Sequence, residues 1–568
     1  MPQSILSRLR AAQIPWTLHI ATLLLSKSLL PSPSLPPFLL AYALTTVLLD
    51  TEAFLAALQD PDEPPLIPHL YLPFLGHVIG MFWHGASYFA RVNAATQYPI
   101  YTLLTLTGRT IVVTDPALAG TIQKASKNTS FYGMILEVTK RLVDLDEPTM
   151  EIIRWNINGE HGPHEGLMHE AGSMVAGELS PGPSLNEMST AQLQQFATLL
   201  DVFVSSPAGV EISLMEFVKR IFTVANAFAI YGPQNPFALT PSLVHDFWTW
   251  ESGMTAVMAN IFPSLTARKP DLAREAINAA LQDFVAKEHY RTASAMIQKR
   301  VQINLKHGLS HKMAGHAELI LLFGIVGNAV PTTFWVLANI FSRPELLARI
   351  REETSKAVIC PRSNPGSPRE KVISVAQLKA TCPLLVSTYR ETIRSVANLS
   401  SVRLVVHTHT VSAPGHRPYL LRKGAMVQIA SGVIHALRAV WGPDAGEFNP
   451  SRFMSATTST EQFSSSSSAT ESTATALPKG VPSAAYRGFG GGSIICPGRH
   501  FAQNEILGFV ALCVHTLEIV DAKTGGSLML PAKNDKRIPL SVMKPVKEPQ
   551  VLIKRREAED SVAWRLEL

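Results

Sequence analysis

The stretch Phe489-Gly-Gly-Gly-Ser-Ile-Ile-Cys496-Pro-Gly-Arg-His-Phe-Ala502 carries a single cysteine from a glycine-rich loop into the start of an apolar helix. The first N–H groups of a helix lack backbone partners and lie at the positive end of its dipole, so both stabilise a thiolate there. Glycines permit close approach of the backbone to a flat ligand, and Pro497 suits a first helical turn. We therefore expect Cys496 to ligate iron in a large planar group.

Other interpretations of this cysteine have to be weighed. A lone cysteine in a chain that is 46% hydrophobic is most often a small buried core residue. A zinc site needs clustered ligands, but the four cysteines include no C-x-x-C pair and no histidines accompany them at ligand spacing. The glycines also do not fit a dinucleotide-binding loop. In such a loop the helix starts on the pyrophosphate directly after the glycines, whereas here Cys496 stands in that place. Zinc and phosphate are disfavoured, and the core cysteine stays as the alternative.

The pattern Phe-x-x-Gly-x-x-x-Cys-x-Gly-Arg-x-x-Ala resembles the cysteine-ligand loop of the cytochrome P-450 superfamily of haem-thiolate enzymes. The resemblance implies that Cys496 is the axial ligand of haem b and that Phe489, Gly492 and Gly498 help to bind the cofactor. It also implies a mainly α fold with small β-sheets, with the haem buried between a long distal helix and a proximal cysteine-ligand loop. Ile494 departs from the family, because many members place arginine or histidine there to bind a haem propionate.

A second motif supports this resemblance. Glu391 and Arg394 are three residues apart on an expected helix, so they share a face and can form a buried ion pair. An E-x-x-R pattern alone usually marks a solvated salt bridge. Here it precedes the cysteine, and between them Phe448-Asn-Pro-Ser-Arg452-Phe453 resembles the family segment whose arginine joins the pair. The resemblance implies a structural triad of Glu391, Arg394 and Arg452 that holds the cysteine loop.

The segment after the Glu/Arg helix predicts a strand. Residues 401–407 alternate β-branched and polar residues. The family often directs an arginine from this strand to a haem propionate, and Arg403 is the residue in that place. The alternative is an edge-strand charge that faces water.

A long apolar segment predicts the distal helix. Residues 319–335 are apolar on all faces, which is typical of a buried helix. Gly327 and Asn328 stand where most family members carry an acid and a threonine that relay protons to oxygen, and this resembles the branch of cholesterol 7-alpha-hydroxylase, sterol 12-alpha-hydroxylase and prostacyclin synthase. Pro331 removes a helix hydrogen bond and should open a kink. Asn328 is the candidate catalytic residue that orders distal water or substrate, or else it satisfies the kink.

Composition and the N-terminal sequence suggest how the chain is organised. Two apolar runs, residues 14–30 and 35–49, predict a membrane anchor within residues 1–58, although each is shorter than the roughly 20 residues of a full span. A proline-rich hinge is expected over residues 59–76, and a catalytic domain over 77–568 with a Ser/Thr-rich insertion at about 455–476.

The net charge of +6 comes from scattered basic residues without a nucleic-acid motif, so no nucleic acid is expected as a partner. A basic surface suits acidic lipid or an acidic electron donor better. Four cysteines without framework spacing fit a domain in a reducing compartment. We expect an endoplasmic reticulum membrane protein whose catalytic domain faces the cytosol, with one or two membrane crossings.

The resemblance implies a monooxygenase that inserts oxygen into an apolar small molecule, such as a steroid, a terpenoid or another secondary metabolite. Electrons would come from a separate NADPH-cytochrome reductase, because the chain has no flavin or nicotinamide domain of its own. Two alternatives stay open because the usual acid and alcohol are missing. One is a reductase-independent isomerase or dehydratase that acts on a peroxide, and the other is a non-catalytic haem-binding protein.

Overall fold

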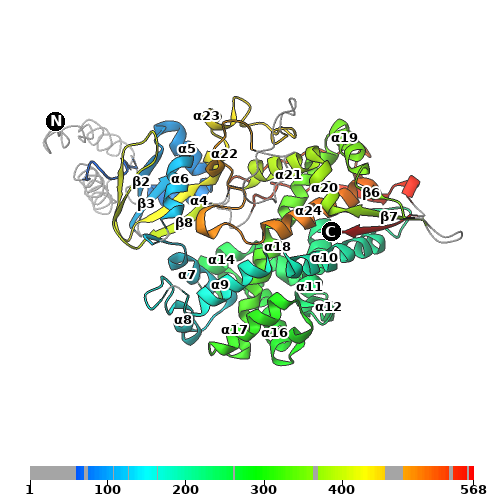
Figure 1. The fold of residues 1–568 in the computed structure, drawn as a ribbon, viewed down its shortest axis with the longest axis horizontal. Coiled ribbons are helices and arrows are strands. Elements are labelled where there is room, and N and C mark those ends of the chain that lie inside the picture. The colour runs from blue at the N-terminus through cyan, green and yellow to red at the C-terminus, as the bar shows by residue number, and fades with distance from the viewer. Residues whose placement is uncertain are drawn as a thin grey trace, which may run out of the picture. The chain divides into compact units, whose positions relative to one another are not determined.

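The structure, a computed structural model, describes residues 59–69, 75–105, 108–125, 127–162, 164–259, 262–361, 369–398, 400–454, 477–536, 542–559 and 562–568 (Figure 1). The chain divides into two compact units. The first comprises Met1–Gly133, Asn398–Ile434 and Asp535–Leu540, and the second comprises Met134–Ala397, His435–Asn534 and Ser541–Leu568. The predicted anchor at 1–58 and the predicted insertion at 455–476 lie outside the described residues.

The first unit is built on a mixed β-sheet with the strand order β1-β2-β3-β11-β8-β4. Its central strands alternate little and are buried on both faces, as expected for Val- and Ile-rich segments. A two-stranded ribbon and three helices complete the unit. The elements are β1 (Leu66–Ile67), α4 (Gly76–His84), α5 (Ser87–Thr96), β2 (Ile100–Thr105), β3 (Gly108–Val113), α6 (Pro116–Lys124), β4 (Thr129–Ser130), β8 (Ser400–Val405), β9 (His409–Val411), β10 (Tyr419–Leu421) and β11 (Met426–Ala430).

The described part of the proline-rich segment is bound to this sheet. Strand β1 pairs in parallel with β2, in the register Leu66 to Thr102. The Glu63 carboxylate, which is 4% exposed, forms ion pairs with Arg109 and Arg422. These contacts fix the path by which the chain enters the folded region.

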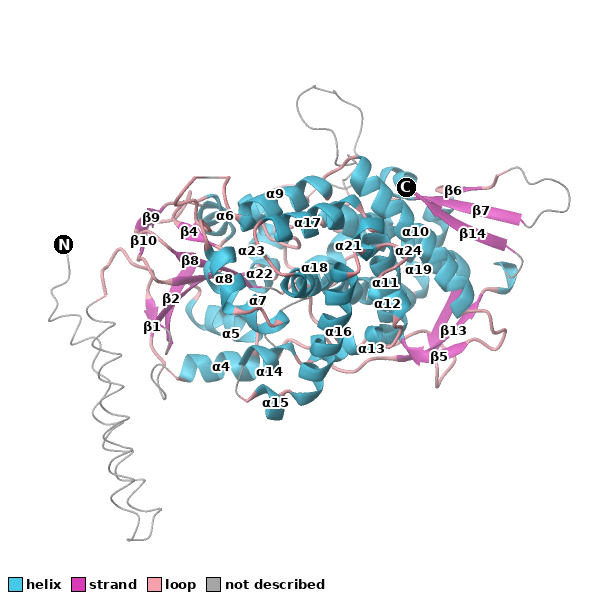
Figure 2. Ribbon diagram, turned by 90° about the horizontal axis from the view of Figure 1, so that it is seen from below, coloured by secondary structure: helices cyan, strands magenta, loops and turns pink. Residues whose placement is uncertain are grey.

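The second unit is mainly helical (Figure 2). Its helices are α8 (Glu147–Arg154), α9 (Leu167–Glu178), α10 (Pro183–Phe203), α11 (Leu214–Tyr231), α12 (Pro236–Leu239), α13 (Leu243–Ser252), α14 (Met254–Ala259), α15 (Pro263–Thr266), α16 (Arg268–Ala286), α17 (Ala295–Lys306), α18 (His311–Phe341), α19 (Pro344–Ser355), α20 (Val375–Thr381), α21 (Pro383–Val396), α23 (Arg438–Trp441) and α24 (Arg499–Thr516). Two further helices, α7 (Tyr132–Val143) and α22 (Ser431–His435), contain boundaries between the units.

Two small sheets lie at the right-hand end of these helices in Figure 2. One has the order β12-β13-β5, and the other has the order β14-β7-β6. Their strands are β5 (Val210–Ser213), β6 (Val358–Ile359), β7 (Arg369–Ser374), β12 (Leu517–Asp521), β13 (Gln550–Arg555) and β14 (Val562–Glu567). The predicted fold class, mainly α with small β-sheets, is confirmed.

Helix α18 is the core element of the second unit. Its first turn is capped by the Ser310 hydroxyl, which accepts the Met313 N–H, and the helix packs against α11, α16, α21 and α24. In the described part of the chain it is the one helix long and apolar enough to cross a membrane, yet 67% of its most apolar window is buried within the protein. Its apolar composition is therefore explained by burial among neighbouring helices.

Candidate functional site

The cysteine loop is a closed turn in front of α24. The Cys496 N–H donates to the Phe489 carbonyl at 3.0 Å, which brings the two ends of the predicted motif together. Gly490 and Gly492 have φ of 77° and 69°, backbone angles that favour glycine. Helix α24 begins at Arg499 with Gly498 as its N-cap, so Pro497 precedes the helix instead of occupying its first turn. No side chain caps this helix start.

The Cys496 thiol is free, as are the other three cysteines. Burial raises the pKa of the Cys496 thiol, and the Gly498 N–H and the charge of Arg499 offset only part of that shift. The helix terminus favours the thiolate, but the cost of desolvation is larger here. A metal that coordinated the sulfur would deprotonate this thiol.

The loop fits a flat apolar group bound to this sulfur. Residues 488–500, which include Phe489 and Cys496, are all at least partly exposed, and Ile495 is 42% exposed. A Cβ atom added to Gly498 would come within 3.8 Å of the sulfur. Uncovered apolar side chains beside the half-buried Cys496 leave a surface that a ligand such as haem would cover.

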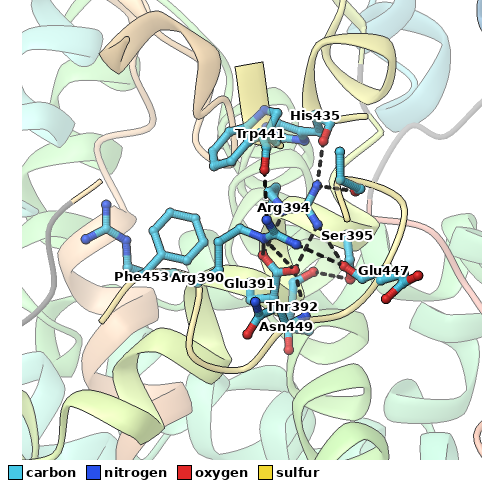
Figure 3. Close-up of polar contacts among 12 residues, drawn as sticks. Arg390, Glu391, Thr392, Arg394, Ser395, His435, Trp441, Glu447, Asn449 and Phe453 are labelled. Carbon is cyan, nitrogen blue, oxygen red and sulfur yellow. Dashed lines mark hydrogen bonds and ion pairs between the residues drawn. The ribbon is translucent and has the colours of Figure 1, made fainter. Parts of the chain in front are cut away.

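Glu391 forms ion pairs with two arginines, Arg394, which Figure 3 labels, and Arg452. Arg394 Nε and Nη2 donate to the two carboxylate oxygens at 2.7 and 2.8 Å, and Arg452 Nε donates to both at 3.1 Å. The Glu391 side chain is fully buried, and the arginine side chains are 3% and 5% exposed. Asp444 pairs with Arg452 at 3.0 Å and supplies a second negative charge. Glu391 therefore contacts both arginines of the predicted triad.

A histidine that the sequence analysis missed connects this cluster to the cysteine loop. Arg394 Nη1 donates to the His435 carbonyl at 2.5 Å (Figure 3). The His435 ring donates through Nδ1 to the Ala397 carbonyl at 3.2 Å and accepts the Arg487 N–H through Nε2 at 2.9 Å. Burial lowers the pKa of His435 to about 3, so the ring is neutral and can accept that bond. Arg487 is two residues before Phe489, so the connection reaches the start of the loop.

In α18 the Asn328 side chain has a partner that the sequence did not indicate. The helix is continuous through Pro331, and the Thr332 hydroxyl donates to the Asn328 carbonyl at 2.7 Å. The Asn328 side-chain oxygen accepts the Val542 N–H at 3.0 Å. The side chain therefore contacts a distant segment and makes no hydrogen bond to the backbone around Pro331.

The position of the Phe323 ring explains why residue 327 is a glycine. A Cβ atom there would lie 2.6 Å from the Phe323 ring, so the ring occupies the space beside the glycine. The Phe323 ring also makes an edge contact with Trp250 of α13, with ring centroids 5.8 Å apart. The α18 and α24 helices pack together, which brings the predicted distal and proximal helices into one packed core.

Arg403 lies on β8 in the first unit, and its side chain is buried at 4% exposure. Strand β8 pairs with β11 and β4, so the alternative of a solvated edge-strand charge is wrong. Nη1 donates to Ser401 Oγ and the Val402 carbonyl at 3.0 and 2.7 Å, whereas Nη2 has no hydrogen-bond partner among the described residues. Burial lowers the pKa of Arg403 to about 10. A buried cation with an open donor fits an anionic group.

A buried polar cluster beside α24 also escaped the sequence analysis. Glu505 accepts from the side-chain amides of Gln192 at 2.6 Å and Asn226 at 3.1 Å. Burial raises the pKa of Glu505 to about 8. No local pattern marks such a cluster, because its members are supplied by α10, α11 and α24.

Comparisons with known proteins agree with this geometry. Cytochrome P450 monooxygenase nodJ of Hypoxylon pulicicidum is 27% identical over 511 residues, which cover 89% of this chain and 93% of that protein. A cytochrome P450 monooxygenase of Gibberella zeae is 28% identical over 471 residues, covering 82% and 83%. The 5-beta-cholestane-3-alpha,7-alpha-diol 12-alpha-hydroxylase of Sus scrofa is 22% identical over 479 residues, covering 82% and 88%.

The family model described as Cytochrome P450 matches residues 202–551, which is more than half of the chain and contains the Glu/Arg pair, the distal helix and the cysteine loop. Members of this family carry haem and act on small molecules with the help of redox partners. The chain belongs to the cytochrome P450 family and is a monooxygenase of that family.

Proposed function

We propose that this monooxygenase is bound to the endoplasmic reticulum membrane, faces the cytosol and oxidises an apolar steroid, terpenoid or other secondary metabolite. The observation that carries the proposal is the closed loop that presents the free Cys496 thiol before α24. Electrons would come from NADPH-cytochrome reductase.

The cofactor that we propose is haem b, held by Cys496 with Phe489, Gly492 and Gly498 around it. Haem supplies iron for oxygen activation, and thiolate ligation favours cleavage of the O–O bond. The chain's own contribution is to hold the sulfur in place through the Phe489 to Cys496 hydrogen bond and the Glu391 cluster behind it. The open Nη2 of buried Arg403 supports its proposed role with a haem propionate.

Two observations support an apolar substrate and a membrane location. The α18 face around Phe323 and Val326 is apolar, which suits a substrate with little polar surface. On α4, close in sequence to the predicted anchor, Phe82 and Trp83 are 72% and 69% exposed. Large exposed aromatic side chains are typical of a surface that meets lipid.

The first test is the difference spectrum of the dithionite-reduced protein with and without carbon monoxide. Wild type should give the red-shifted Soret band of thiolate ligation, and Cys496→Ala should lose it. Cys360→Ser, at an exposed cysteine, and Cys513→Ala, at a buried cysteine of α24, are the matched controls and should keep it. A folded, haem-supplemented wild type without the band would contradict the proposal.

Turnover then separates the remaining candidates. Substrate oxidation that consumes NADPH only when reductase is added is the expected result. The alternative is an isomerase or dehydratase, which would convert a hydroperoxide without reductase. This alternative is kept because Gly327 and Asn328 supply neither an acid nor an alcohol on α18. A protein that binds haem and turns over neither class would contradict the proposed function.

A further inference from the structure

Two side chains on one face of α18 bind the backbone of two consecutive residues near the C-terminus. Asn328 Oδ1 accepts the Val542 N–H at 3.0 Å, and Trp335 Nε1 donates to the Met543 carbonyl at 2.7 Å. Asn328 and Trp335 are seven positions apart, which is nearly two helical turns and places them on the same face. We call these four residues the distal clamp.

The clamp is completed by α21. The Met543 N–H donates to the Val396 carbonyl, the last residue of α21, at 3.1 Å. Both polar backbone groups of Met543 are therefore bound, one to each helix. A segment held at three backbone groups of two consecutive residues has little freedom to shift along either helix.

The segment continues from the clamp to a fourth element. Lys544 forms an ion pair with Glu251 of α13, whose side chain is 5% exposed. The Lys544 carbonyl also accepts the Asn534 N–H at 2.9 Å. Residues 542–544 therefore join α13, α18 and α21.

The clamp also fixes the orientation of the Asn328 amide. A backbone N–H requires an acceptor, so the side-chain oxygen must face Val542 and the NH2 group must face the other way. The NH2 group makes no hydrogen bond with the residues that the structure describes. The fold thus uses Asn328 Oδ1 as an acceptor. A proton relay would require a titratable group, and an amide has none.

We propose that Asn328 and Trp335 are positioning residues that fix residues 542–543 as a wall of the substrate pocket and thereby set which ligands fit. This inference rests on the proposed function, because α18 borders the substrate only if the haem lies at Cys496. It assigns the glycine–asparagine motif to pocket shape and not to oxygen chemistry.

The first arm of the test measures hydrogen–deuterium exchange of the Val542 amide in the full chain. Asn328→Leu should speed this exchange roughly three- to tenfold, because one hydrogen bond is lost. Trp335→Phe keeps an aromatic side chain, although a smaller one, removes the Nε1–H donor and should loosen the same segment. Asn328→Asp keeps an acceptor oxygen and should retain protection. Thr332→Val, one turn away on α18, is the matched control and should leave the exchange unchanged.

The second arm measures ligand discrimination by optical titration of the haem-loaded protein with imidazole and 4-phenylimidazole. Imidazole is small, whereas the phenyl group needs a defined wall. Asn328→Leu and Trp335→Phe should change the ratio of the two affinities about threefold or more, and Asn328→Asp and Thr332→Val should not.

If the exchange rate of the Val542 amide is unchanged in Asn328→Leu, the proposal that Asn328 fixes this segment is wrong. Normal exchange and normal affinity ratios in Asn328→Asp, combined with loss of coupling between NADPH consumption and product, would assign Asn328 to proton handling instead. Failure of the proposed function has a different signature, namely a wild type without the thiolate–carbon monoxide band, and the exchange arm is decided whether or not that band is seen.

Discussion

Arg394 donates two parallel hydrogen bonds to the buried Glu391 carboxylate, at 2.7 and 2.8 Å. The remaining donors of Arg394 bind the carbonyls of His435, Ala445 and Glu447. One ion pair therefore orders three separate backbone positions of the segment that leads to the cysteine loop. This geometry explains how a short motif on α21 can affect the position of a cysteine about a hundred residues later.

Removing one partner of this pair should be costly. In Glu391→Ala the buried guanidinium of Arg394 is left without its counter-charge, and stability should fall by about 3 to 5 kcal/mol. Chemical denaturation of the purified protein measures this change, and the haem content per chain should fall with it. The control is Glu216→Ala, which breaks the exposed Glu216–Arg220 pair on α11 and should change stability by less than about 1 kcal/mol. Equal effects of the two substitutions would show that the buried pair has no special role.

Arg403 should have opposite effects in the two forms of the protein. Without haem, Arg403→Met removes a buried cation with an unbound Nη2, so the stability should stay the same or rise. With haem, the same substitution should weaken cofactor retention, because the proposed propionate partner is gone. Thermal unfolding of apoprotein and haem transfer to apomyoglobin measure the two effects. Faster haem loss together with a destabilised apoprotein would point to simple unfolding of β8.

The features that were predictable from sequence are those carried by local spacing. Glu391 and Arg394 are one helical turn apart, and Phe489 and Cys496 are in one loop, so their contacts follow from short-range geometry. The fold class followed from the same motifs through the family resemblance. Such patterns survive in the sequence because a helix or a turn fixes the distance between their members.

The features that were missed join distant segments through backbone or buried polar groups. The Asn328 contact reaches Val542, 214 residues away, and any residue with an N–H could be its donor. His435 acts through a carbonyl and a ring nitrogen, which no motif records. The direction of the Cys496 pKa was missed because burial, unlike a helix start, cannot be counted from residue types.

Gly327 and Gly324 on α18 provide a matched pair of substitutions. Gly327→Ala should push the Phe323 ring out of its contact with Trp250, because the new Cβ would lie 2.6 Å from that ring. Gly324→Ala meets nothing within 4 Å and should stabilise the helix by up to about 1 kcal/mol. Tryptophan fluorescence and thermal unfolding should separate the two. A stability gain in both, with unchanged fluorescence, would mean that Phe323 is not fixed by Gly327.

The raised pKa of Glu505 predicts that the stability of the protein depends on pH. Its folded-state pKa is raised to about 8 from an ordinary 4.5, so between these values the unfolded chain has released a proton that the folded chain retains. Folding then becomes less favourable as pH rises, by up to about 1.4 kcal/mol per pH unit from this group. Glu505→Gln is neutral at every pH and removes that dependence. Its stability relative to wild type should therefore increase from pH 5 to pH 8 in urea denaturation, and parallel profiles for the two proteins would show that Glu505 is ionised in the folded state.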